Sequence, residues 1–218
     1  MNPPTETGVA ARLKAETRQL HTLAERSGVM ADLLQGRFSL GAYCALLRNL
    51  QAIYAALEAG LDKHPTDARL WRQQLRRWQA LAQDLACLDA DARSAEAPLA
   101  QATVAYRARL VALAQTEPVL LLAHASVRYL GDLHGGQMLA RLVRQRFGLD
   151  GPGGTDFHAF GDAAQVEALK RDFRAGLDAL VLSPQQTDAF VAEACQAFRR
   201  HQQLFEELQA CCTALGAL

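Results

Sequence analysis

The chain has 218 residues, and hydrophobic side chains occupy 50% of its positions, which excludes a disordered chain and allows a sizeable buried core. Its 23 Lys and Arg balance 23 Asp and Glu, so the net charge is zero. A nucleic-acid-binding protein needs a basic excess to hold phosphates, so we expect no nucleic-acid partner.

The N-terminal third shows apolar residues with a period of 3.6, which is typical of amphipathic helices. The pattern predicts a helix over residues 8–27 and a short helix over 29–35. Ser39 is a suitable N-cap for a long helix through YCALLRNLQAIYAALEAGL.

The middle of the chain begins with a helix break at Pro65. We expect Thr66 or Asp67 to cap a helix through LWRQQLRRWQALAQDL. The next predicted helix covers residues 99–114.

The C-terminal half is predicted to contain three longer helices. The first begins near Thr116 and Pro118 and ends at about Phe147. The others cover residues 163–180 and 184–214, and Ser183 with Gln186 fits a capping box.

These elements predict an all-α fold of about eight helices in a single domain, residues 1–218. Residues 1–7 are expected to be disordered, and the Gly/Pro-rich segment 148–162 is expected to be a loop. No apolar run reaches about 18 residues, so we expect no membrane anchor. The five cysteines show no CxxC or Cys/His metal pattern, so we expect reduced thiols and a cytoplasmic location.

Three glycines, Gly131, Gly135 and Gly136, interrupt a predicted helix. Each costs about 1 kcal/mol relative to alanine, so their presence needs a reason. Gly131 and Gly135 lie one turn apart on one face, where a flat ligand could contact the backbone. Close packing of two helices through small residues is the alternative.

The first helix has polar residues at matching spacing. Lys14, Arg18 and His21 share one face, and Lys14 to His21 spans roughly 10 Å. Neutral imidazole is a good iron ligand, and two cations can pair with two carboxylates. The distance from Lys14 to His21 is similar to the distance from a porphyrin's iron to its propionates. Glu25, one turn further, could accept the second ring N–H of His21. A partly exposed histidine on a solvated, charged face is the alternative.

Three segments occur in a specific order: LKAETRQLHTLAE (13–25), TEPVLLLAHASVRYLGDLHGGQML (116–139) and LFEELQ (204–209). They resemble the proximal helix, the distal helix and the last helix of the heme oxygenases. The resemblance covers nearly the whole chain and implies a heme oxygenase-like helical bundle with haem between the proximal and distal helices.

This resemblance implies that haem is both substrate and cofactor. O2, with electrons from a ferredoxin or a flavoprotein reductase, would open the macrocycle to biliverdin, CO and ferrous iron, and retained basic positions favour the α isomer. Expected partners are haem and an electron-donor protein, and the expected state is a monomer or weak dimer. The alternatives are a haem carrier or sensor without turnover, and a related helical enzyme, such as a thiaminase-like bundle, with a different ligand.

The resemblance also assigns haem-binding residues. His21 matches the axial ligand of the haem iron. Basic residues near the propionates match Lys14, Arg18, Lys170 and Arg174. Aromatic residues of the last helix match Phe198 and Phe205, for which ordinary core packing is the alternative.

The distal helix carries the expected catalytic residues. Gly131 and Gly135 match glycines that pack against haem and leave room for O2. Asp132 matches an aspartate that organises waters for proton delivery. Residues matching Arg128, Tyr54 and Tyr106 join its hydrogen-bond network, although an exposed ion pair with Arg128 is the plain alternative for Asp132.

The sequence departs from the family pattern at Ser126, Arg76, His134 and His201. Both histidines map to the distal side, and we hypothesise that they form a hydrogen-bonded pair. Two unrelated surface histidines, or His134 as an iron ligand, are the alternatives.

Overall fold

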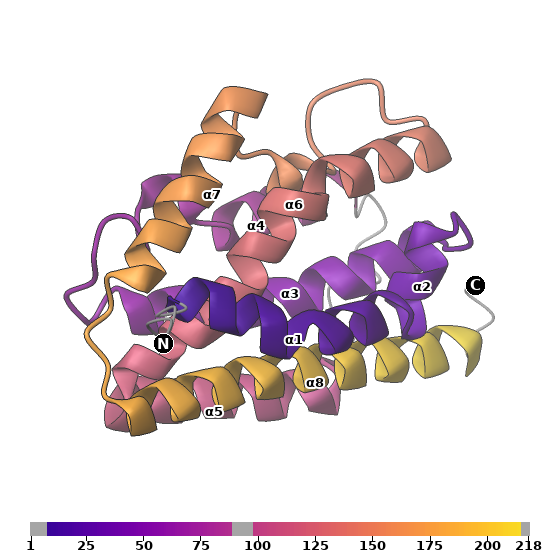
Figure 1. The fold of residues 1–218 in the computed structure, drawn as a ribbon. Helices are drawn as coiled ribbons and strands as arrows, with labels where there is room; N and C mark the ends of the chain where they lie inside the picture. The colour runs from indigo at the N-terminus through magenta and orange to yellow at the C-terminus, as the bar shows by residue number, and fades with distance from the viewer. Residues whose placement is uncertain (1–7, 89–97, 215–218) are drawn as a thin grey trace.

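The computed structural model describes residues 8–88 and 98–214, so the predicted disorder of residues 1–7 lies outside the described residues. The described residues form eight α-helices, joined by loops and three short 3-10 helices, without any strand (Figure 1). The all-α prediction is therefore confirmed.

Most helices begin and end within three residues of the predicted positions. They are α1 (Val9–Glu25), α2 (Gly28–Leu34), α3 (Leu40–Leu61), α4 (Trp78–Leu88), α5 (Gln101–Thr116), α6 (Leu121–Phe147), α7 (Ala163–Asp178) and α8 (Pro184–Ala214). The Ser39 side chain caps α3 by accepting a hydrogen bond from the backbone of Ala42. Ser183 and Gln186 form the predicted capping box at the start of α8.

The predicted helix through residues 70–85 is wrong in its first half. A turn and the short 3-10 helix Gln73–Leu75 occupy this segment, and α4 begins only at Trp78. The reason is a long-range contact, because the Glu58 carboxylate on α3 accepts hydrogen bonds from the backbone N–H groups of Arg77 and Trp78. The buried Arg77 guanidinium donates to the carbonyls of Phe157 and Ala159, which fixes this segment away from a helical path.

The core gathers along α3 and α8, and Figure 1 shows α1 lying along α8, with α6 bending partway along its length. All four tyrosines of the chain are almost completely buried: Tyr43, Tyr54, Tyr106 and Tyr129. A buried hydroxyl needs a hydrogen-bond partner, so these tyrosines bring polar side chains into the centre of the bundle.

The segment 148–162 is a loop, as predicted, apart from the 3-10 helix Asp156–His158. Gly148 ends α6 in the left-handed conformation at a φ of 62°, which a glycine adopts without strain. Within residues 8–88 and 98–214, we find no helix both long enough and apolar enough to cross a bilayer.

Candidate functional site

Two cavities meet between α1 and α6. The inner cavity, of about 320 Å³, is lined by side chains of α1, α2, α3, α6 and α8 and of the segment after α6. The outer cavity, of about 660 Å³, lies between α1, α6, α7 and α8. His21, Gly131 and His134 line both, so the two cavities adjoin along this seam.

The glycines of α6 have two different roles. A Cβ atom on Gly131 or Gly135 would meet nothing within 4 Å, and both residues line the inner cavity. A Cβ on Gly136 would lie 3.4 Å from the carbonyl oxygen of His158, so this glycine serves close packing. The helix therefore presents bare backbone to the cavity at Gly131 and Gly135, as expected for a surface that receives a flat ligand.

His21 lies on α1 at the seam of the two cavities, with its side chain half exposed. The Oε2 atom of Glu25 lies 3.5 Å from Nδ1 of His21, where a carboxylate can accept the Nδ1 proton. The ring of Phe198 packs edge-on against the imidazole, with 5.9 Å between centroids. This arrangement leaves Nε2 of His21 for a ligand.

Cations gather at the outer cavity, which is lined by Lys14, Arg18 and Arg174. The predicted face of α1 is confirmed, because Lys14, Arg18 and His21 line one cavity. Lys170 lines neither cavity in this structure, and its ammonium group pairs with Glu167 at 2.7 Å. Its contact with a propionate therefore stays a prediction.

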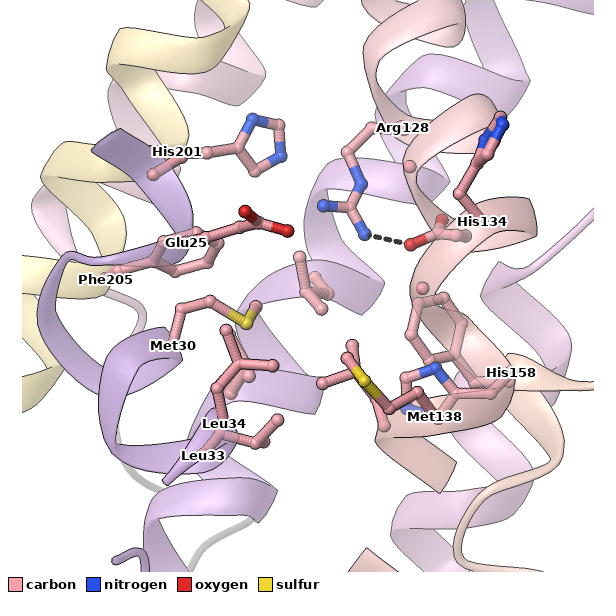
Figure 2. A pocket seen from close by; sticks show the side chains of 18 of the residues that line it. Glu25, Met30, Leu33, Leu34, Arg128, His134, Met138, His158, His201 and Phe205 are labelled. Atoms are coloured by element: carbon pink, nitrogen blue, oxygen red, sulfur yellow. Dashed lines mark hydrogen bonds and ion pairs between the residues drawn. The ribbon is translucent and has the colours of Figure 1, made fainter. Parts of the chain in front are cut away.

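A buried polar cluster lies at the inner cavity. Arg128 donates to Asp132 at 2.8 Å, drawn as the dashed line in Figure 2, and to the hydroxyl of Tyr54 at 3.1 Å. The Tyr54 hydroxyl donates in turn to Asp132. The side chains of Arg128 and Asp132 are only 11% and 9% exposed, which excludes the plain surface ion pair.

Burial raises the pKa of Asp132 above its usual range, and the adjacent charge of Arg128 limits the rise. Burial also raises the pKa of Tyr54, so its hydroxyl keeps its proton and remains a donor. A carboxyl group with a raised pKa holds and releases a proton closer to neutral pH than an exposed aspartate does.

The expected link between Tyr106 and this cluster is wrong as a direct contact. The Tyr106 hydroxyl bonds to Nδ1 of His124 at 2.9 Å, and Nε2 of His124 bonds to Glu193 at 2.9 Å. The partly exposed Arg109 extends this second network by pairing with Glu193 at 2.7 Å. The Tyr106 hydroxyl therefore bonds to a buried histidine of α6 and not to Asp132.

The predicted pair of His134 and His201 does not form. Nδ1 of His134 donates to the carbonyl of Leu130, and its Nε2 accepts from Arg174 at 2.8 Å. His201 is buried on α8, donates from Nδ1 to Ala197 at 2.8 Å, and has no partner for Nε2 among the described residues. Figure 2 shows the two rings on opposite sides of the pocket, with Arg128 between them.

The remaining predicted residues are divided between the cavities. Phe205 lines the inner cavity and Phe198 the outer one. Ser126 also lines the outer cavity, whereas Arg76 pairs with Asp62 and lines neither.

Sequence reasoning missed the apolar wall of the inner cavity and the buried His158 beside it. The apolar wall consists of Met30, Leu33, Leu34, Leu46, Leu47, Leu50, Met138, Leu139 and Phe157. Apolar side chains at helical spacing are the same in a core and in a cavity wall, so nothing in the sequence distinguishes them. His158 follows the Gly/Pro loop, where no helical pattern fixes the direction of its side chain.

Comparisons with known proteins agree with this geometry. The family model described as heme oxygenase matches residues 7–207. Heme oxygenase 1 of a Nostoc strain is 34% identical over 204 residues, which cover 92% of this chain and 86% of that protein. Heme oxygenase 1 of Bos taurus is also 34% identical, over 92% of this chain and 71% of that protein.

Solved structures show the same similarity. A crystal structure of heme oxygenase-1 from Synechocystis in complex with heme has a TM-score of 0.87 and 32% identity, covering 96% of each chain. Heme oxygenase-2 from Synechocystis in complex with heme and NO has a TM-score of 0.89 and 31% identity, covering 96% of this chain and 88% of that one.

Proposed function

The chain belongs to the heme oxygenase family of haem-degrading enzymes, and we propose that it binds haem at the seam of the two cavities, with His21 as the iron ligand. This proposal rests on the residues at the seam, where the two cavities adjoin. An imidazole on α1 and bare glycine backbone on α6 line the same space.

The residues present fit haem in three respects. Nε2 of His21 has no protein partner within hydrogen-bond distance in the described structure, and Glu25 is placed to fix the ring tautomer through Nδ1. Gly131 and Gly135 leave space for a flat macrocycle against α6. Cations from α1 and α7 line the outer cavity, where carboxylates of the macrocycle can form charge-assisted hydrogen bonds.

When bound, haem supplies the iron at which O2 is activated, with electrons from a ferredoxin or a flavoprotein reductase. The protein's contribution is positioning and electrostatics. Lys14, Arg18 and Arg174 orient the macrocycle from one edge, with Lys170 as the further predicted contact. Phe198 and Phe205 support it from α8.

The Asp132 carboxyl holds and moves a proton on the inner side of the site. Arg128 and Tyr54 fix the direction of this carboxyl, and burial raises its pKa, so it exchanges a proton more readily than an exposed aspartate does. The inner cavity is lined mainly by apolar side chains, so we expect protons to reach the site through waters bonded to this cluster.

This cluster favours turnover over a haem carrier or sensor. A carrier needs an axial ligand and anchoring cations, but burying Asp132 and Arg128 costs free energy without improving retention of haem. A thiaminase-like enzyme gives no reason for His21 at the seam. The α isomer of biliverdin, a monomer or weak dimer, and the cytoplasm as the place of action are parts of the same proposal.

The test is a single turnover. The purified chain is loaded with haem without O2, then supplied with O2 and a reductant, and the product is analysed by absorption and chromatography. We expect biliverdin, mainly the α isomer, together with CO and chelatable ferrous iron. Stable haem after several equivalents of electrons would favour the carrier, and mainly β or δ biliverdin would refute the proposed orientation.

A further inference from the structure

His134 makes two hydrogen bonds that together fix its ring. Nδ1 bonds to the carbonyl oxygen of Leu130, one turn earlier on α6, and Nε2 bonds to Nη2 of Arg174 on α7 at 2.8 Å. Arg174 can only donate, because a guanidinium carries no acceptor. Nε2 must therefore carry the lone pair and Nδ1 the proton, and only this neutral tautomer satisfies both partners.

This contact lies at the seam of the proposed haem site. His134 lines both cavities, and Arg174 lines the outer one. We propose that His134 is a positioning residue that holds the Arg174 guanidinium towards the outer cavity, so that α7 receives a haem carboxylate at a defined place. The inference rests on the proposed function, which it deepens by assigning how one anchoring cation is oriented.

Arg174 keeps enough donors for both roles. The guanidinium has five N–H donors, and His134 uses one of them on Nη2, so a carboxylate can still be bound by two others. Among the described residues, no carboxylate lies within ion-pairing distance of Arg174, whereas the neighbouring Lys170 is already paired with Glu167. Arg174 is therefore the α7 cation that is available to an incoming anion.

The contact depends on a neutral His134. A proton on Nε2 would remove the acceptor and place two cations in contact. The groups that face His134 are Glu167, Lys170 and Arg174 on α7, Lys14, Arg18 and His21 across the outer cavity on α1, and Arg128 with Asp132 on α6. Burial lowers the pKa of His134, and the charges of Lys170 and Arg174 lower it further. The contact is thus present at neutral pH and is lost on acidification below the usual histidine pKa of about 6.5.

A double-mutant cycle on haem affinity tests the inference. The variants are His134→Ala, Arg174→Ala and the double variant, and each is titrated with haem and with haem dimethyl ester, whose carboxylates are masked. Arg171→Ala is the matched control, because Arg171 is an exposed cation on the same helix that lines neither cavity.

We expect Arg174→Ala to weaken haem binding about 10-fold, the value of a charge-assisted hydrogen bond. His134→Ala should weaken it about 5-fold through misplacement of Arg174, and should add nothing in the Arg174→Ala background. Neither variant should change the affinity for the dimethyl ester, and Arg171→Ala should change neither affinity. Independent effects of the two substitutions on haem affinity, or an equal loss with the ester, would overturn the positioning role.

A spectroscopic measurement on the haem-free chain gives a second readout. At pH 7.5 the nitrogen-15 chemical shifts of His134 should show a protonated Nδ1 and an unprotonated, hydrogen-bonded Nε2. Arg174→Ala should shift Nε2 alone, and an unaffected Nε2 would show that the contact is absent. If the unmodified chain forms no haem complex at all, the proposed function fails first, whatever the state of His134.

Discussion

Replacement of Asp132 separates its structural role from its chemical role. Asp132→Ala removes the carboxylate that faces the guanidinium of Arg128 at 2.8 Å and the hydroxyl of Tyr54. The Arg128 side chain is only 11% exposed, so its charge would remain in the interior without a counterion. Asp132→Asn keeps an acceptor oxygen and nearly the same volume but removes the charge.

The structure gives the expected magnitudes. Loss of one partner of a buried ion pair costs about 3–5 kcal/mol of unfolding free energy. Whole domains are stable by about 5–15 kcal/mol, so Asp132→Ala should still fold, with a Tm lower by about 10 °C. Asp132→Asn should cost about 1–3 kcal/mol, because one hydrogen bond can persist. Both variants should bind haem, and biliverdin formation should fall about 100-fold or more, because neither side chain exchanges a proton.

The assay combines urea unfolding followed by circular dichroism with the single-turnover product analysis. Asp172→Asn is the matched control, because Asp172 pairs with Arg72 where both side chains are about one-third exposed, so its loss should cost less than about 1 kcal/mol. A normal biliverdin yield from Asp132→Asn would refute the proton role. Unchanged stability of Asp132→Ala would refute the buried ion pair.

Three further substitutions test other parts of the site. His21→Ala should change the unfolding free energy by no more than about 0.5 kcal/mol, because the side chain is half exposed. It should change the absorption spectrum of bound haem and abolish turnover until imidazole is added. An unchanged spectrum and rate would mean that another residue is the ligand. Gly135→Leu should raise helix stability by up to about 1 kcal/mol, because nothing lies within 4 Å of an added Cβ. It should also weaken haem binding, because the leucine side chain fills the cavity. An unchanged haem affinity would mean that haem binds elsewhere. Although burial raises the pKa of Glu193, hydrogen bonds from His124 and Arg109 outweigh it and lower the pKa to about 2. Its stabilisation is therefore present above the unfolded pKa of 4.5 and is lost as pH falls towards 2, so Glu193→Gln should flatten the dependence of unfolding free energy on pH in this window, and an identical slope in the wild type would contradict the assignment.

Local sequence patterns predicted most of the fold because they act within one helix. Ser39 caps α3 and Ser183 caps α8 through neighbours three residues away, and such contacts can be read from the sequence. The segment before Trp78 could not be predicted, because its shape depends on Glu58 and on carbonyls about 80 residues distant. Helical periodicity carries no information about such contacts.

The same difference between contacts within one helix and contacts between helices applies to the site. Spacing on α1 placed Lys14, Arg18 and His21 on one face, and the structure brings all three to one cavity. The partners of His134, His201 and Tyr106 depend on how separate helices approach each other, so the pairing of the two histidines was wrong. The bond between His124 and Tyr106 had no local pattern to reveal it.

A crystal structure of the haem complex tests the central claim most directly. We predict haem at the seam of the inner and outer cavities, with Nε2 of His21 on the iron, the macrocycle against Gly131 and Gly135, and its carboxylates beside Arg18 and Arg174. Iron bound by a residue other than His21, or a macrocycle outside this seam, would contradict the account.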